Sequence, residues 1–137
     1  MTENVQGRKG PPAKSYLDLV AWQKSMDLTR EVYAASAGFP REEVYGLTAQ
    51  LRRAAVSVAC NIAEGQARVT RGEFIQFLGH ARGSLMEAET LLRLAVSLRY
   101  MDSGRGTGLL SLADEVGRLI NGLINSLRRS PTKGPIA

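Results

Sequence analysis

Hydrophobic residues recur along this chain at intervals of three and four, the spacing that gathers side chains on one face of an α-helix. No stretch alternates in the way expected of a β-strand, and no internal repeat is present. The pattern predicts four helices, at 16–37, at 40 or 44 to 65, at 71–100 and at 109–127. We therefore expect an all-α protein.

Local signals mark where these helices start. Ser15, with Asp18 three residues later, forms a capping-box arrangement. Thr70 and Glu73 repeat that arrangement before the third helix. The run DSGRGTG at 102–108 holds three glycines in seven residues and predicts a loop before the fourth helix.

Each predicted helix has an apolar face that we expect to lie in the core. The faces of the first three are Leu19, Trp22, Met26, Thr29, Tyr33 and Ser36; Leu47, Leu51, Ala54, Ala55, Val58 and Ile62; and Phe74, Phe77, Leu78, Ala81, Leu85, Ala88, Leu92 and Ala95. Four amphipathic helices joined by short connections pack most simply as an up-down-up-down four-helix bundle. We expect a single bundle domain at 15–128, between flexible basic tails at 1–14 and 129–137.

The second helix has another apolar face, opposite the first, where a bundle helix normally presents charged residues. This face holds Val56, Ala59, Cys60, Ala63 and Ala67. A helix that is apolar on two sides is usually buried on two sides, so we predict that this face forms a homo-oligomer interface. The alternative is that alanines here only reflect helix propensity.

A row of polar residues runs along the same helix between its two apolar faces. The row holds Arg53, Ser57, Asn61 and Glu64. We expect it to contact Ser84 and Glu87 of the third helix. We interpret the row as a polar seam that fixes helix register. The competing interpretation is a phosphate-binding face, whose arginines, together with those that end the fourth helix, would be Arg52, Arg53, Arg68, Arg71, Arg128 and Arg129.

The charge of the chain is concentrated near its ends. The net charge is +5, of which residues 1–14 and 128–137 supply all, so residues 15–127 sum to zero. This distribution weakens the compositional case for nucleic-acid binding by the bundle, although basic tails bind phosphate non-specifically.

The sequence lacks the residue patterns that are typical of catalytic sites. The chain has one histidine, His80, and one cysteine, Cys60, with no Glu-x-x-His pair and no phosphate-binding loop. We expect no enzyme activity, no metal site, no cofactor and no small-molecule substrate. No apolar run is long enough to span a membrane and no secretory signal is present, so we expect a cytoplasmic protein.

Four segments carry more than helical periodicity. They read DLVAWQKSMDLTREVY at 18–33, YGLTAQLRRAAVSVACNIAEGQAR at 45–68, FIQFLGHARGSLMEAETLL at 74–92 and GRLINGLINSL at 117–127. Together they resemble the bacterial four-helix bundle proteins known as 23S rRNA intervening sequence proteins. The resemblance implies a bundle protomer that assembles into a homopentamer, with no established enzymatic role and an RNA association suggested only by gene location.

Two functional hypotheses follow. The first is a non-enzymatic homo-oligomer that binds RNA or DNA through its basic tails and arginines. The second is a protein-interaction scaffold or accessory protein, such as the related pentameric bundles that assist the reverse transcriptase of diversity-generating retroelements.

Overall fold

The computed structural model describes residues 15–129, which form four long α-helices and two short 3₁₀ helices. The α-helices are α1 (Val20–Ser36), α2 (Leu47–Gln66), α3 (Arg71–Ser97) and α4 (Ser103–Arg129). The 3₁₀ helix η1 (Tyr16–Asp18) precedes α1, and η2 (Arg41–Glu43) lies between α1 and α2. The predicted tails lie outside the described residues, except for Arg129, which is the last residue of α4.

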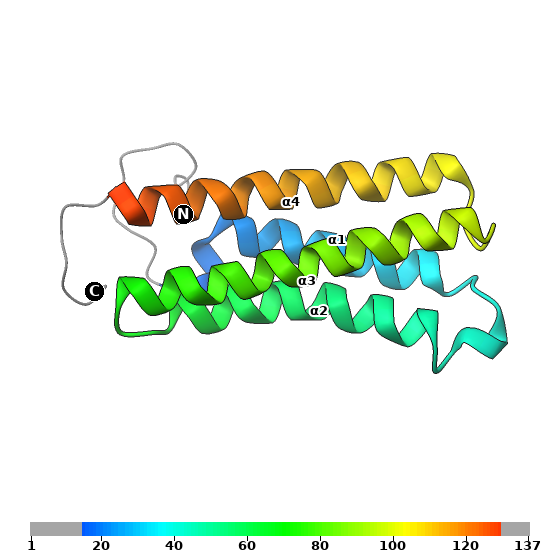
Figure 1. Ribbon diagram of the computed structural model, residues 1–137, viewed down its shortest axis with the longest axis horizontal. Coiled ribbons are helices and arrows are strands. Elements are labelled where there is room, and N and C mark those ends of the chain that lie inside the picture. Colours follow the sequence, from blue (N-terminus) through cyan, green and yellow to red (C-terminus); the bar gives the residue numbers. More distant parts are fainter. Residues whose placement is uncertain (1–14, 130–137) are drawn as a thin grey trace.

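The helices form an up-down-up-down bundle, which confirms the predicted fold class. Consecutive helices run antiparallel (Figure 1), each packs against the next, and α1 closes the bundle against α4. The first and last described residues therefore lie at the same end of the bundle, beside the turn between α2 and α3 (Figure 1).

The core of the bundle is aliphatic. Its fully buried large side chains include Leu28, Leu51, Ile62, Leu78, Leu85, Leu92 and Ile120. The predicted core faces of α2 and α3 are confirmed, except that Phe77 is only half-buried. A core mostly of Leu, Ile, Val and Ala suffices because long helices bury apolar area along their whole length.

The predicted core face of the first helix is wrong by about one residue of rotation. The buried residues of α1 are Ala21, Ser25, Leu28, Val32, Ala35 and Ser36. Trp22, Met26 and Thr29 are half-buried and Tyr33 is 44% exposed. Aliphatic and small residues occupy the core side of α1, and Trp22 and Met26 lie at its edge with α2.

The predicted loop at 102–108 is also wrong, because α4 begins at Ser103. Asp102 starts the helix by accepting a hydrogen bond from the backbone N–H of Arg105 at 2.8 Å. Gly106 is buried where α4 crosses α3, and a Cβ there would lie 2.4 Å from a methyl carbon of Val96. Gly106 thus allows close packing of α4 on α3, which outweighs its poor helix propensity.

Candidate functional site

The outer face of α2 forms one wall of an apolar groove beside α1. We call this the α1–α2 groove; it has a volume of about 430 Å³ and is lined by Tyr16, Trp22, Met26, Thr29, Val56, Ala59, Cys60 and Ala63. Four of the five residues predicted at an oligomer interface line it, and the fifth, Ala67, is exposed beyond it. Val56 remains 37% exposed, whereas Ala59 is already buried within the protomer.

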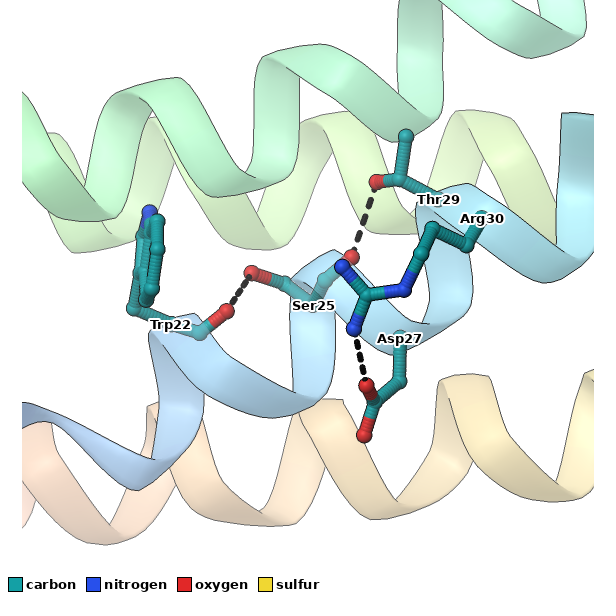
Figure 2. Close-up of polar contacts among 5 residues, drawn as sticks. All are labelled: Trp22, Ser25, Asp27, Thr29 and Arg30. Atoms are coloured by element: carbon teal, nitrogen blue, oxygen red, sulfur yellow. Dashed lines mark hydrogen bonds and ion pairs between the residues drawn. The ribbon is translucent and has the colours of Figure 1, made fainter. Parts of the chain in front are cut away.

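The wall contributed by α1 is held by hydrogen bonds along that helix. The Ser25 hydroxyl donates to the carbonyl of Trp22, and the Thr29 hydroxyl donates to the carbonyl of Ser25, both at 2.8 Å (Figure 2). Thr29 also lies 3.2 Å from the carbonyl of Ala55, on α2. Tyr16 stacks edge-on against Trp22, with 5.0 Å between ring centroids. The groove is thus preformed by contacts inside the protomer.

The polar row of α2 divides into a bonded part and a solvated part. The hydroxyls of Ser57 and Ser84 lie 2.8 Å apart across the α2–α3 interface, and the Asn61 amide donates to the Ser57 carbonyl at 2.8 Å. The structure therefore brings together the middle of the predicted seam.

The charged members of the predicted seam do not join this network. Arg53, Glu64 and Glu87 are exposed, and no hydrogen bond or ion pair within residues 15–129 is assigned to them. The predicted contact between Glu87 and Arg53 is absent from the described part of the chain. These side chains remain available to solvent or to a partner.

Two of the six predicted phosphate-binding arginines, Arg52 and Arg53, lie within α2. Arg53 is exposed, whereas Arg52 is half-buried, and its guanidinium donates to the Ser36 hydroxyl at 2.7 Å and to the Tyr33 carbonyl at 3.2 Å. The Tyr33 carbonyl belongs to the last turn of α1, where a cation is favourably placed. These two hydrogen bonds hold the Arg52 guanidinium inside the protomer, which makes Arg52 the least available arginine of the set.

Four of the others gather at one end of the molecule. Arg68 and Arg71 flank the α2–α3 turn, and Arg128 and Arg129 end α4 at the same end of the bundle (Figure 1). We call this the basic end, and it is also where residues 1–14 and 130–137 are attached. Glu64 and Glu73 are nearby acidic residues on α2 and α3.

A family model described as 23S rRNA-intervening sequence protein matches residues 17–122. The chain belongs to this family. It is similar to the crystal structure of a protein with unknown function, from the S23 ribosomal protein family of Bacteroides thetaiotaomicron. That likeness has a TM-score of 0.69 and 21% identity, covers 77% of this chain and 98% of the other, and shows the fold alone. A search of curated proteins finds no match.

At the opposite end from the arginines, this member of the 23S rRNA-intervening sequence protein family has a junction that the sequence did not reveal. The Glu43 carboxylate accepts the backbone N–H of Leu47, at the start of α2, and the Tyr100 hydroxyl after α3, both at 2.9 Å. These two hydrogen bonds lower the pKa of Glu43. The bond to Glu43, with some burial, raises the pKa of Tyr100. A spacing of 57 residues leaves no sequence signal for such a pair.

Two further findings concern this family member as a whole. Within residues 15–129, no three histidine, cysteine or acidic side chains converge as a metal site would require. None of the helices in that range combines the length and apolarity needed to cross a bilayer.

Proposed function

We propose that this protein is a non-enzymatic homo-oligomer that binds RNA or DNA through its basic end. The observation that carries the proposal is the position of the two termini. The segments that hold Arg8, Lys9, Lys14 and Lys133 attach to the end of the bundle that already presents Arg68, Arg71, Arg128 and Arg129. Both segments that carry excess positive charge are thus joined to the chain at the same end of the bundle.

Such an arrangement favours phosphate binding without sequence readout. Each phosphate neutralised by an arginine or lysine releases counterions, so the affinity falls steeply as salt rises. The exposed arginines of the basic end can position a nucleic-acid backbone, but they do not read bases by this contact alone.

A titration in two salt concentrations tests the proposal. Fluorescence anisotropy with labelled RNA and DNA oligonucleotides should show binding at about 50 mM salt that weakens at least tenfold at about 200 mM. Deleting residues 1–14 and 130–137 should reduce the salt slope, and so should the double change Arg68→Gln with Arg71→Gln. The control, Arg41→Gln with Arg93→Gln, removes the same charge elsewhere and should leave the slope unchanged. No binding by the full chain at low salt would refute the proposal.

The proposal of self-association rests on the α1–α2 groove and the outer face of α2. Half-exposed Val56 and Cys60 continue the apolar lining to the surface, and Arg53 and Glu64 border it as exposed charges. An apolar centre with a polar rim is the usual anatomy of a protein interface. The resemblance to the intervening sequence proteins supports a homopentamer as the assembly.

The same groove favours a second candidate function, that of an interaction scaffold or accessory protein, for example to a reverse transcriptase. In that case the bundle, and not the terminal segments, carries the function. A pull-down with the chain lacking 1–14 and 130–137 discriminates the two, because a scaffold keeps its partner whereas the proposed nucleic-acid binder loses most of its affinity.

The proposal of a non-enzyme rests on where the reactive side chains lie. Cys60 lies among apolar residues of the groove, and His80 lies against the edge of Phe77, with 5.7 Å between ring centroids. Within residues 15–129, no hydrogen bond or ion pair joins either side chain to an acid or base that could activate it for nucleophilic or general-base catalysis. The cytoplasmic location expected from the sequence remains part of the proposal.

A further inference from the structure

The guanidinium of Arg68 lies over an aromatic ring at the basic end. Its guanidinium carbon lies 4.4 Å from the centroid of Phe77, which comes from α3, whereas Arg68 itself follows the end of α2. Arg68 is exposed although its guanidinium carbon lies over the ring, so the group contacts Phe77 and is still accessible to solvent. A guanidinium over an aromatic face is attracted by the ring quadrupole.

A glycine brings the two residues together. Gly65 is buried against α3, and a Cβ there would lie 2.8 Å from the Cβ of Phe77 and 3.0 Å from a ring carbon of Phe74. The backbone N–H of Arg68 then donates to the carbonyl of Gly65 at 3.0 Å, which turns the chain directly over Phe77. The close approach of α2 and α3 at Gly65 therefore positions Arg68 against the Phe77 ring.

The nearest acidic residue along the chain does not compete for Arg68. Glu64 is exposed one turn before it, and no ion pair between the two is found among residues 15–129. Exposed His80 also packs against Phe77, edge-on, with 5.7 Å between ring centroids and 88° between planes. Two exposed planar groups, Arg68 and His80, thus contact one aromatic ring at the end of the bundle that holds the other arginines.

We propose that Arg68, supported by Phe77 and flanked by His80, is a stacking site for unpaired bases, so that the basic end prefers single-stranded nucleic acid. This inference rests on the proposed function. Bases in a duplex are already stacked and cannot reach a flat side chain, whereas splayed bases stack on aromatic rings and guanidinium planes. Stacking tolerates any base, so the preference is for strand state and not for sequence.

The test replaces the planar group and keeps its charge. Arg68→Lys retains the positive charge but loses the flat guanidinium. Anisotropy titrations use a single-stranded oligonucleotide of about 20 nucleotides, as RNA and as DNA, and the duplex of the same sequence. We expect Arg68→Lys to weaken single-strand binding roughly five- to tenfold and duplex binding less than twofold. His80→Ala should act in the same direction, and Arg93→Lys, on the exposed side of α3, is the matched control.

The outcomes separate this inference from the function on which it rests. If the wild-type chain binds neither single-stranded nor duplex nucleic acid at low salt, both the proposed function and the stacking site are refuted. If it binds, but Arg68→Lys weakens single-strand and duplex binding equally or not at all, only the stacking site is overturned. Phe77→Leu, which keeps an apolar contact for Gly65 and removes the ring, should reproduce the selective loss, and a thermal melt of each variant checks that the bundle is folded.

Discussion

At the scale of single residues, Arg99 shows how the tight connection between α3 and α4 is made. Within residues 15–129 it alone among non-glycine residues has a positive φ, of 65°. The N–H groups of Arg99 and Tyr100 donate to the carbonyls of Val96 and Ala95, both at 2.9 Å. This is a Schellman motif, whose left-handed position usually holds glycine because other residues are strained there.

Arg99→Gly should therefore stabilise the protein. Removing the Cβ relieves left-handed strain at a side chain that is exposed, and we expect a gain of about 0.5–1 kcal/mol in the free energy of unfolding. Arg93→Gly, in the regular part of α3, should instead cost about 1 kcal/mol. Urea denaturation followed by circular dichroism measures both. A loss of stability in Arg99→Gly would contradict this account of the turn.

The Glu43 junction makes part of the stability depend on pH. Because the pKa of Glu43 is lowered in the folded protein, its contribution is complete above the usual pKa of 4.5 and is lost as the pH falls through the folded value. The melting temperature of the wild type should exceed that of Glu43→Gln at pH 7, and this difference should shrink toward pH 3. Glu42→Gln is the control, and its difference from wild type should not change in the same way. The raised pKa of Tyr100 predicts a second loss at alkaline pH, as Tyr100 deprotonates.

Sequence reasoning placed the small polar residues better than the charged ones. It anticipated that Ser84 would meet the row holding Ser57 and Asn61, because a short side chain at a helix interface has few partners within reach, in its own helix or in the one opposite. It also expected Glu87 to pair with Arg53, yet both side chains are exposed. Periodicity gives the direction in which a long side chain leaves the helix, but solvation and rotamer entropy decide whether it pairs.

At the scale of elements, all four helices were predictable and their fine placement was not. Two neighbouring faces of α1 are apolar by sequence, one with Trp22 and Met26 and one with Leu28 and Val32, and the structure buries the second. Likewise, Gly106 reads as a loop residue until its contact with Val96 is known. Hydrophobicity alone does not distinguish a core face from a groove.

Close helix approach predicts opposite effects for two glycines. Gly65→Ala would push against Phe77 and Phe74, and we expect a loss of about 1–3 kcal/mol in the free energy of unfolding. Gly83→Ala, in α3, meets nothing within 4 Å and should gain about 0.5–1 kcal/mol through helix propensity. Denaturant titration of the two variants side by side measures both effects. Equal effects of the two substitutions on stability would mean that packing against α3 does not require glycine at position 65.

At the scale of the whole molecule, the topology was predictable because short connections force antiparallel neighbours. The gathering of Arg68, Arg71, Arg128 and Arg129 at one end follows from that topology, since helix ends that are distant in sequence meet in space. The α1–α2 groove was not foreseen as a cavity, because the alanine face of α2 revealed only one of its walls.

Ala63→Glu tests the groove as the subunit interface. A carboxylate in this apolar lining would be buried unpaired in an assembly but remains hydrated in a free protomer, so we expect dissociation with the helical content retained. Size-exclusion chromatography with light scattering measures the mass. Ala34→Glu, an exposed change on α1 outside the groove lining, should leave the mass at the wild-type value. A wild-type mass for Ala63→Glu as well would exclude this face as the interface.

The even number of antiparallel helices has a practical consequence for experiments. Because Ser15 and Arg129 lie at the same end of the bundle, a fusion partner or affinity tag on either terminus is tethered next to Arg68 and Arg71 (Figure 1). A chain immobilised by such a tag would turn this end toward the sensor surface. A label inserted at the η2 connection, at the far end, would leave the same arginines facing the solution.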